Sequence, residues 1–186
     1  MTALELKQIS QLATPNQVLV VAKQFQPKIN QHTVNNDWSL YLDRIQDPGN
    51  MGTILRIADW FGIQHVFCSP DCVELYNSKV IQSSMGAFLR VNMITIEFEA
   101  LRATFPHLPI LGTVVEGGQS IFHYQTTQHG LIVMGNESQG VSAHIHAQAS
   151  HLITIPSRGG SGMESLNVAV ATGIICGTLR NPVVSI

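Results

Sequence analysis

Three polar, glycine-rich stretches of this sequence contain the residue types of ligand-binding loops. They are GTVVEGG at 112–118, LIVMGNESQG at 131–140 and ITIPSRGGSGMESLNVAVATG at 153–173. None has the spacing of a phosphate-binding loop, and none has the GxGxxG fingerprint of a dinucleotide-binding turn. Phosphoryl transfer and hydride transfer therefore lose support. Tight turns also need glycine, so each stretch taken singly has a purely structural alternative.

A fourth stretch, DPGNMGTILRIADWFGI at 47–63, predicts an amphipathic helix over residues 51–61. Asn50 is a suitable N-cap residue, and Gly62 stands where the helix would end. Arg56 lies just beside the apolar face of this helix. Because exposed arginines are usually only solvated, the pattern leaves two alternatives for Arg56, a solvated charge or a group that faces a site.

The elements that must position these residues alternate between β-branched runs and helical patterns. This alternation predicts an α/β fold, a mostly parallel sheet with helices on both faces. We expect strands at 38–43, 65–68, 91–98, 110–115, 131–134 and 152–155. We expect helices at 51–61, 77–83, 99–105, 141–148 and 165–179. In such folds ligands bind beyond the carboxyl ends of the strands, which is where the glycine-rich stretches would lie.

Composition narrows the class of protein further. The chain has 186 residues, of which 45% are hydrophobic and 12% charged, as in a compact globular domain. No apolar run has the length of a membrane span, and three cysteines give no disulfide framework, so we expect reduced thiols in the cytoplasm. His144 and His146 lack a third ligand at metal-binding spacing, so no metal is expected. A formal net charge of −2 excludes a general polybasic nucleic-acid binder.

The stretches DRIQDPGNMGTILRIADWFGI, LIVMGNESQGVS and ITIPSRGGSGMESLNVAVATGI resemble the three ordered motifs of the SpoU (TrmH-like) branch of the SPOUT RNA methyltransferases. Together they cover residues 43–174. The resemblance implies an α/β knot, with a deep trefoil knot near the C-terminus, and S-adenosylmethionine bound by the knot loops. It also implies a homodimer and methyl transfer to a ribose 2′-hydroxyl of tRNA or rRNA.

The resemblance also assigns roles to individual residues. The residues it implies in catalysis are Asn50, Arg56, Glu137, Ser165 and Asn167. The residues it implies in cofactor binding, mostly through backbone atoms, are Thr113, Gly135, Ile155 and Leu166. A sulfonium methyl is already electrophilic, so the protein has to place it in line with a more nucleophilic 2′-oxygen, without a metal.

Arg56 has two possible roles within this chemistry. The family resemblance implies that its counterpart is usually given a part in removing the hydroxyl proton. Arginine stays protonated in practically every protein setting, so we favour Arg56 as the holder of a phosphate or of the developing oxyanion. Plain helix capping is an alternative for Ser165 and Glu137, and for Asn50 it is compatible with a role in the site.

Two further expectations concern organisation. Residues 1–37, which include the linker-like PKINQHTVNND, are predicted to be an N-terminal appendage or the remnant of a substrate-binding domain, with the methyltransferase domain at 38–186. The final helix offers small and apolar side chains for a two-fold contact, at Val168, Ala169, Ala171, Thr172 and Ile175. The alternative function is a non-catalytic RNA-binding or assembly module that retains the fold.

Overall fold

The computed structural model describes residues 2–10, 14, 17–124, 128–158 and 164–180. Within these ranges one sheet has the strand order β3-β2-β1-β6-β4-β7-β5, and all neighbouring strands are parallel. The strands are β1 (Trp38–Leu42), β2 (His65–Cys68), β3 (Asn92–Thr95), β4 (Ile110–Thr113), β5 (Gln119–Ser120), β6 (Gly130–Met134) and β7 (His151–Thr154). This architecture confirms the predicted α/β class.

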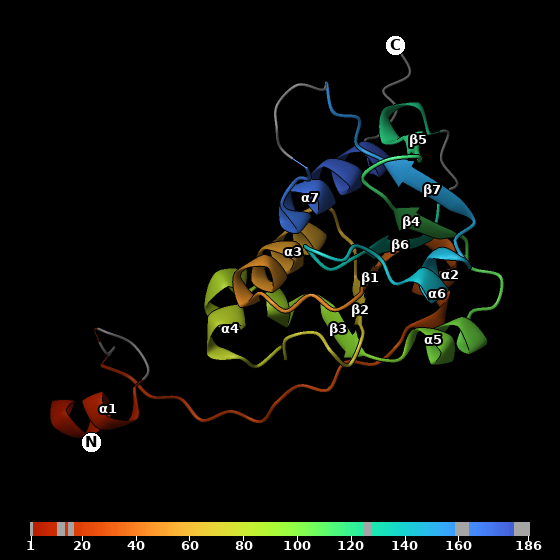
Figure 1. Ribbon diagram of the computed structural model, residues 1–186. Coiled ribbons are helices and arrows are strands. Elements are labelled where there is room, and N and C mark those ends of the chain that lie inside the picture. The colour runs from red at the N-terminus through yellow and green to blue at the C-terminus, as the bar shows by residue number, and fades with distance from the viewer. Residues whose placement is uncertain (1, 11–13, 15–16, 125–127, 159–163, 181–186) are drawn as a thin grey trace, which may run out of the picture.

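Helices cover both faces of the sheet. The helices of the described residues are α1 (Ala3–Ile9), which lies away from the sheet, and α2 (Gln31–Asn36), α3 (Pro48–Trp60), α4 (Ser78–Ser84), α5 (Phe98–Thr104), α6 (Ala143–His146) and α7 (Val168–Leu179), with 3-10 turns η1 (Ala87–Leu89) and η2 (Ile121–His123). In Figure 1, α3, α4 and α7 lie on one face, and α2, α5 and α6 lie on the other. Leu40 and Leu42 of β1 belong to the core beneath α3 and α7, whereas Tyr41 belongs to the core beneath α5. This alternation is the period of two that a strand buried on both faces requires.

Helix α3, the helix of the DPGN stretch, packs closely against two other helices. A Cβ atom at Gly52 would lie 1.9 Å from Oγ of Ser83, so α3 and α4 cross where glycine leaves room. On its other side α3 runs beside α7, and a Cβ atom on Gly173 would lie 3.6 Å from the Ile57 side chain. These contacts fix the direction in which the N-terminus of α3 points.

The N-terminus of α3 differs from the sequence prediction. Asp47, not Asn50, is the N-cap, because Oδ1 of Asp47 accepts a hydrogen bond from the Asn50 backbone N–H at 2.7 Å. Pro48 occupies the first turn, where its missing N–H costs nothing. The prediction that Asn50 caps the helix is therefore wrong, and its side chain is left free for other contacts.

Other element boundaries also differ. The strand expected over 91–98 ends at Thr95, because Phe98 begins α5 and its ring packs edge-on against Tyr41 with centroids 5.2 Å apart. The linker-like stretch before β1 contains helix α2, whose Val34 is fully buried, so the linker interpretation is wrong for this part. Strand β5 has only two residues and was not predicted.

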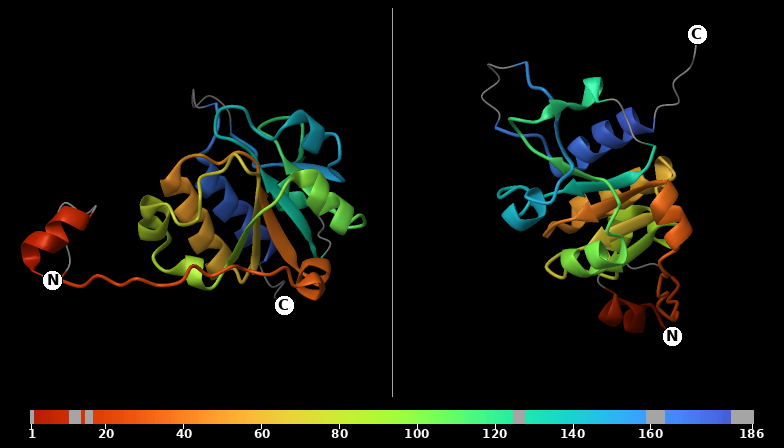
Figure 2. Two further views of the ribbon diagram at one scale, coloured as in Figure 1. Left: turned by 90° about the horizontal axis from the view of Figure 1, so that it is seen from below. Right: turned by 90° about the vertical axis from the view of Figure 1, so that its right-hand side faces the viewer.

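Residues 17–30 extend away from the sheet, and α1 lies apart from the rest of the molecule in the left view of Figure 2. The contacts that tie this segment to the domain include a hydrogen bond from the Tyr76 hydroxyl to the Phe25 carbonyl at 2.7 Å and one from the Asn30 N–H to Nε2 of His65 at 3.1 Å. The division of the chain at residue 37 stays a prediction. Over the described residues, no helix combines the length and the apolar character needed to cross a membrane.

Candidate active site

A large groove opens at the carboxyl ends of the central strands. The sheet order reverses between β1 and β6, since β2 and β3 lie on one side of β1 and β4 and β7 lie beyond β6. Such a switch point separates the loops that follow the two strands and creates a crevice for a ligand. The groove here has a volume of about 1350 Å³ and is lined by residues that follow β1, β4, β6 and β7.

The four residues that the family resemblance assigns to the cofactor all line this groove. They are Thr113, Gly135, Ile155 and Leu166, and Ser165 and Glu137 line it as well. The Thr113 hydroxyl donates to the Val133 carbonyl at 2.8 Å, which ties the end of β4 to β6. Leu166 is half-exposed, so its apolar side chain is available to a ligand. Four segments that are distant in sequence thus converge on one site.

The loop after β6, residues 135–140, is closed on itself. A Cβ atom at Gly135 would lie 2.2 Å from backbone atoms of Gly140 and Val141, so only glycine fits there. Asn136 and Gly140 exchange two backbone hydrogen bonds of 3.1 and 2.9 Å. Oδ1 of Asn136 accepts further hydrogen bonds from Ser138 and Gln139. This loop is therefore shaped before any ligand binds.

Glu137, Asn50 and Asn167 form a hydrogen-bonded row beside the groove. Nδ2 of Asn50 donates to Oε1 of Glu137 at 2.8 Å, and Nδ2 of Asn167 donates to Oδ1 of Asn50 at 2.9 Å. Asn167 is also the N-cap of α7, where its Oδ1 accepts from the N–H groups of Ala169 and Val170. The row joins residues from three motifs and thus brings together three of the five predicted catalytic residues.

The helix starts exclude plain capping as the role of Ser165 and of Glu137. Helix α7 begins at Val168 with Asn167 as its cap, so Ser165 is not the N-cap, and the predicted helix start at 165 is wrong. Ser165 instead is exposed in the groove wall. Helix α6 follows Ser142, so Glu137 does not cap it. The Glu137 carboxylate is used by Asn50.

Arg56 stands apart from this row. It lies six positions beyond Asn50 on α3, about 9 Å along the helix axis, and its side chain is exposed. Among the described residues, none forms a hydrogen bond or an ion pair with Arg56. Trp60, one turn further and on the same side of α3, is 85% exposed. The guanidinium is thus open to an anion from outside the chain, while its place in the reaction stays a prediction.

Sequence reasoning missed two charged residues of the site, Asp43 and Arg44, which follow β1. Asp43 follows β1 and is only 2% exposed. Burial acts to raise the pKa of Asp43, but hydrogen bonds from Arg44 and Ser142 hold it below its ordinary value. Oδ2 of Asp43 accepts from the Ser142 N–H at 2.7 Å and from its hydroxyl at 2.6 Å. An acidic and a basic residue directly after a buried strand were the available signal.

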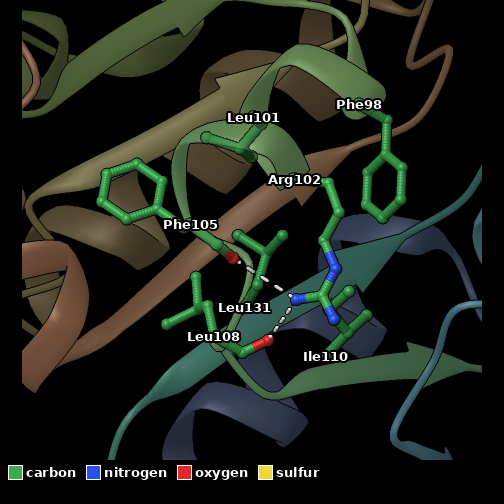
Figure 3. Close-up of a pocket in the computed structure, with 7 residues that line it drawn as sticks. All are labelled: Phe98, Leu101, Arg102, Phe105, Leu108, Ile110 and Leu131. Carbon is green, nitrogen blue, oxygen red and sulfur yellow. Dashed lines mark hydrogen bonds between the residues drawn. The ribbon is translucent and has the colours of Figure 1, made fainter.

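A second cavity lies on the opposite face, between α5 and the sheet. Figure 3 shows the Arg102 guanidinium aimed at the carbonyls of Phe105 and Leu108, with hydrogen bonds of 3.3 and 2.9 Å. The cavity has a volume of about 10 Å³, which allows at most one water molecule. It is a packing gap rather than a ligand site. Over the described ranges, no cluster of His, Cys, Asp and Glu has the makings of a metal site.

The fold and the groove define an α/β protein with a ligand site at the switch point of a parallel sheet. The family model described as "SpoU rRNA Methylase family" matches residues 37–177, and the chain belongs to this family. The chain is 27% identical to the 23S rRNA (guanosine(2553)-2′-O)-methyltransferase RlmP of Bacillus subtilis, over 92% of this chain and 68% of that protein.

Two solved structures are similar over most of the chain. A protein of the TrmH family from Porphyromonas gingivalis superimposes with a TM-score of 0.79 at 36% identity, over 94% of this chain and 70% of that one. The SpoU methyltransferase AviRb from Streptomyces viridochromogenes, in complex with AdoMet, gives a TM-score of 0.71 at 25% identity, over 81% and 63%. The chain spans 50%, 68% and 61% of the length of three curated relatives.

Proposed function

We propose that this chain binds S-adenosylmethionine in the groove and transfers its methyl group to a ribose 2′-hydroxyl of rRNA or tRNA. The observation that carries the proposal is the convergence on one groove of the segments that follow β1, β4, β6 and β7, next to the Glu137–Asn50–Asn167 row. Membership of the SpoU family and the AdoMet-bound AviRb structure support the same cofactor and reaction.

The groove residues fit this cofactor. The close approach at Gly135 leaves its loop backbone as the wall of the groove, where peptide groups can hydrogen-bond to an adenosine. Apolar side chains of Ile155 and Leu166 supply the surface on which a flat base can pack. Bound there, S-adenosylmethionine supplies an electrophilic methyl group.

The residues of the row and Arg56 have separate tasks in this mechanism. The 2′-oxygen forms a bond to the methyl carbon as the sulfonium–methyl bond breaks, and the hydroxyl proton is lost to water. Asn50 and Asn167 fix the Glu137 loop against the two helix N-termini and orient the acceptor ribose. Ser165, exposed in the groove wall, contacts the RNA. Arg56 holds a phosphate or the negative charge that develops on the 2′-oxygen.

Binding of S-adenosylhomocysteine, the product, tests the cofactor site without a known RNA. Calorimetry should give micromolar affinity, about −8 kcal/mol, for the parent chain. Gly135→Ala should abolish it, because the added Cβ displaces the loop, whereas Gly173→Ala in α7 should not, since its Cβ makes an ordinary contact. No heat and no thermal shift with millimolar ligand would refute the proposal.

Ribosomal RNA is favoured because the matching family is described as rRNA methylases and because RlmP is named for 23S rRNA. The alternative, a non-catalytic RNA-binding module, predicts RNA binding without methyl transfer. Single-turnover transfer with labelled cofactor separates the two functions.

We further propose a homodimer. The dimer residues expected from the sequence need correction, because Val168, Ala169, Thr172 and Ile175 are buried within the single chain. Apolar side chains that are exposed near α3 and α7 remain for a second copy: Trp60, Leu89 and Val170. Light scattering at tens of micromolar should give twice the chain mass, and Val170→Asp should lower it.

The deep C-terminal trefoil knot and the cytoplasmic location are likewise part of the proposal. Family membership supports the knot. The free cysteines Cys68, Cys72 and Cys176 are consistent with a reducing compartment.

A further inference from the structure

Arg44 has an unusual backbone conformation for its residue type. It follows β1 directly, at the lip of the groove, with a φ of 60°. This left-handed region is disfavoured for residues with a Cβ atom and is normally left to Gly, Asn or Asp. Such a conformation persists only when surrounding contacts hold it in place.

Both backbone groups of Arg44, the N–H and the carbonyl, are hydrogen-bonded. Its N–H donates to Oγ of Ser69 at 2.9 Å, which anchors it to the segment after β2. Its carbonyl accepts from Nδ2 of Asn136 at 2.9 Å, at the start of the Glu137 loop. The left-handed turn thus aims the carbonyl at the loop that carries a residue of the row.

The side chain of Arg44 holds the other end of the same loop. Nη2 donates to the Gly140 carbonyl at 3.2 Å, and Nη1 donates to Oε1 of Gln139. Nε donates to Oδ1 of Asp43 at 3.1 Å, and the Asp43 carboxylate in turn accepts from Ser142, just beyond the loop. The guanidinium is therefore itself fixed by a buried carboxylate, with the side chain of Arg44 26% exposed.

We propose that Arg44 is a positioning residue that fixes the 136–140 loop and, through it, the place of Glu137 relative to Asn50. The loop is gripped at Asn136 by the carbonyl of Arg44 and at Gly140 by its guanidinium, so Glu137 is fixed from both sides. This inference rests on the proposed cofactor site, because the same loop lines the groove.

The test compares Arg44→Asn with the parent. Asparagine tolerates the left-handed backbone, so the contacts of the N–H and carbonyl survive while the guanidinium grip is lost. We expect faster hydrogen exchange of the amides in residues 136–140 and an affinity for S-adenosylhomocysteine lowered about tenfold, the scale of losing hydrogen bonds to a charged group. Arg44→Lys, which keeps the positive charge and a donor group without the planar fork, should recover part of the affinity.

Arg180→Asn is the matched control. Arg180 is 25% exposed and likewise pairs with an aspartate, Asp37, through its Nη atoms, and it contacts the carbonyl of Gly62 rather than the groove. It should change neither the exchange of 136–140 nor the affinity. A merely structural role for Arg44 predicts equal losses of thermal stability in both variants with no change in loop exchange or affinity, and this result would overturn the inference. Failure of the parent to bind S-adenosylhomocysteine would refute the proposed function instead.

Discussion

Asn50 donates a hydrogen bond of 2.8 Å to the carboxylate of Glu137, 87 positions further along the chain. The Oδ1 atom of the same Asn50 side chain accepts from Asn167. One amide therefore connects the N-terminus of α3 to the loop after β6 and to the N-terminus of α7. The side-chain amide of Asn50 can do both, because its Nδ2 group donates while its Oδ1 accepts.

Asn50→Asp should damage methyl transfer at least as much as Asn50→Ala. The alanine removes both hydrogen bonds of the row, whereas the aspartate keeps an acceptor for Asn167 but replaces the donor to Glu137 with a second, repelling carboxylate. We expect single-turnover transfer to ribosomal RNA to fall by about 10²-fold, the scale of misplacing a catalytic group. Asn36→Ala is the control, because Asn36 is also exposed and hydrogen-bonded, at 2.8 Å to His32, but lies in α2. Equal rates for parent and Asn50→Ala would remove the row from the reaction.

Arg56→Ala should lower methyl transfer by about 10²-fold or more while S-adenosylhomocysteine affinity stays unchanged. The guanidinium lies outside the groove, and over the described part of the chain no residue pairs with it, so the effect belongs to the RNA or the transition state. Arg56→Lys should restore only part of the rate, because lysine retains the charge without the planar fork. Arg180→Asn is the control and should transfer at the parent rate. The same rate for Arg56→Ala would show that Arg56 is only a solvated surface charge.

Gly52→Ala should lower the free energy of unfolding by about 1–3 kcal/mol, the usual cost of overpacking. Its Cβ would meet Ser83 and the backbone nitrogen of Ser84 at 2.7 Å, so α3 and α4 would have to separate. Gly173→Ala is the matched helical control, with an ordinary contact of 3.6 Å, and should be neutral or stabilising by up to about 1 kcal/mol. Urea unfolding monitored by circular dichroism measures both. Equal stabilities for the two variants would contradict the close crossing.

Acid should weaken the domain through His65. Burial lowers the pKa of His65 from its ordinary value of 6.5, and the neutral ring accepts from the Asn30 N–H. In the unfolded chain His65 takes up a proton near pH 6.5, whereas in the folded chain it does so only at lower pH. The free energy of unfolding therefore falls as the pH drops from 6.5 toward the lower pKa of the folded state. His65→Gln, which keeps an acceptor but does not titrate, should reduce this fall. A control is His107→Gln at an exposed position. The unfolding temperature is measured at pH 8 and at pH 5.5. An equal drop between the two pH values in the parent and in His65→Gln would contradict this role of His65.

Sequence reasoning located the sheet because its strands are buried on both faces. Runs such as LIVM at 131–134 carry apolar side chains toward both cores, and their β-branched residues mark them as strands. The two-residue β5 and the helix α2 escaped because neither has enough apolar residues to form a pattern. The motifs at Asn50, Glu137 and Asn167 were found by family resemblance, but their hydrogen-bonded row depends on contacts across 87 and 117 positions.

Capping shows why the remaining site residues could not be assigned locally. Asp47 and Asn50 are both good N-cap residues. Asp47 is the N-cap of α3, because Pro48 suits the first helical position. Asn167 displaced Ser165 for the same role in α7. The charged pair after β1 marks Arg44 in the sequence, but its role could not be assigned from it, since the groups that hold its backbone and its guanidinium lie 25, 92 and 96 positions away.

Methyl transfer to a ribose 2′-oxygen is measured with S-adenosylmethionine that carries a deuterated methyl group. The chain is incubated with ribosomal RNA and, separately, with tRNA from cells that lack its gene, and the RNA is digested to nucleosides for mass spectrometry. We expect a trideuteromethyl group on the ribose of one nucleoside, present with the parent and reduced about 10²-fold with Arg56→Ala. Deuterium on a base, or its absence from every nucleoside despite measured binding of S-adenosylhomocysteine, would contradict it.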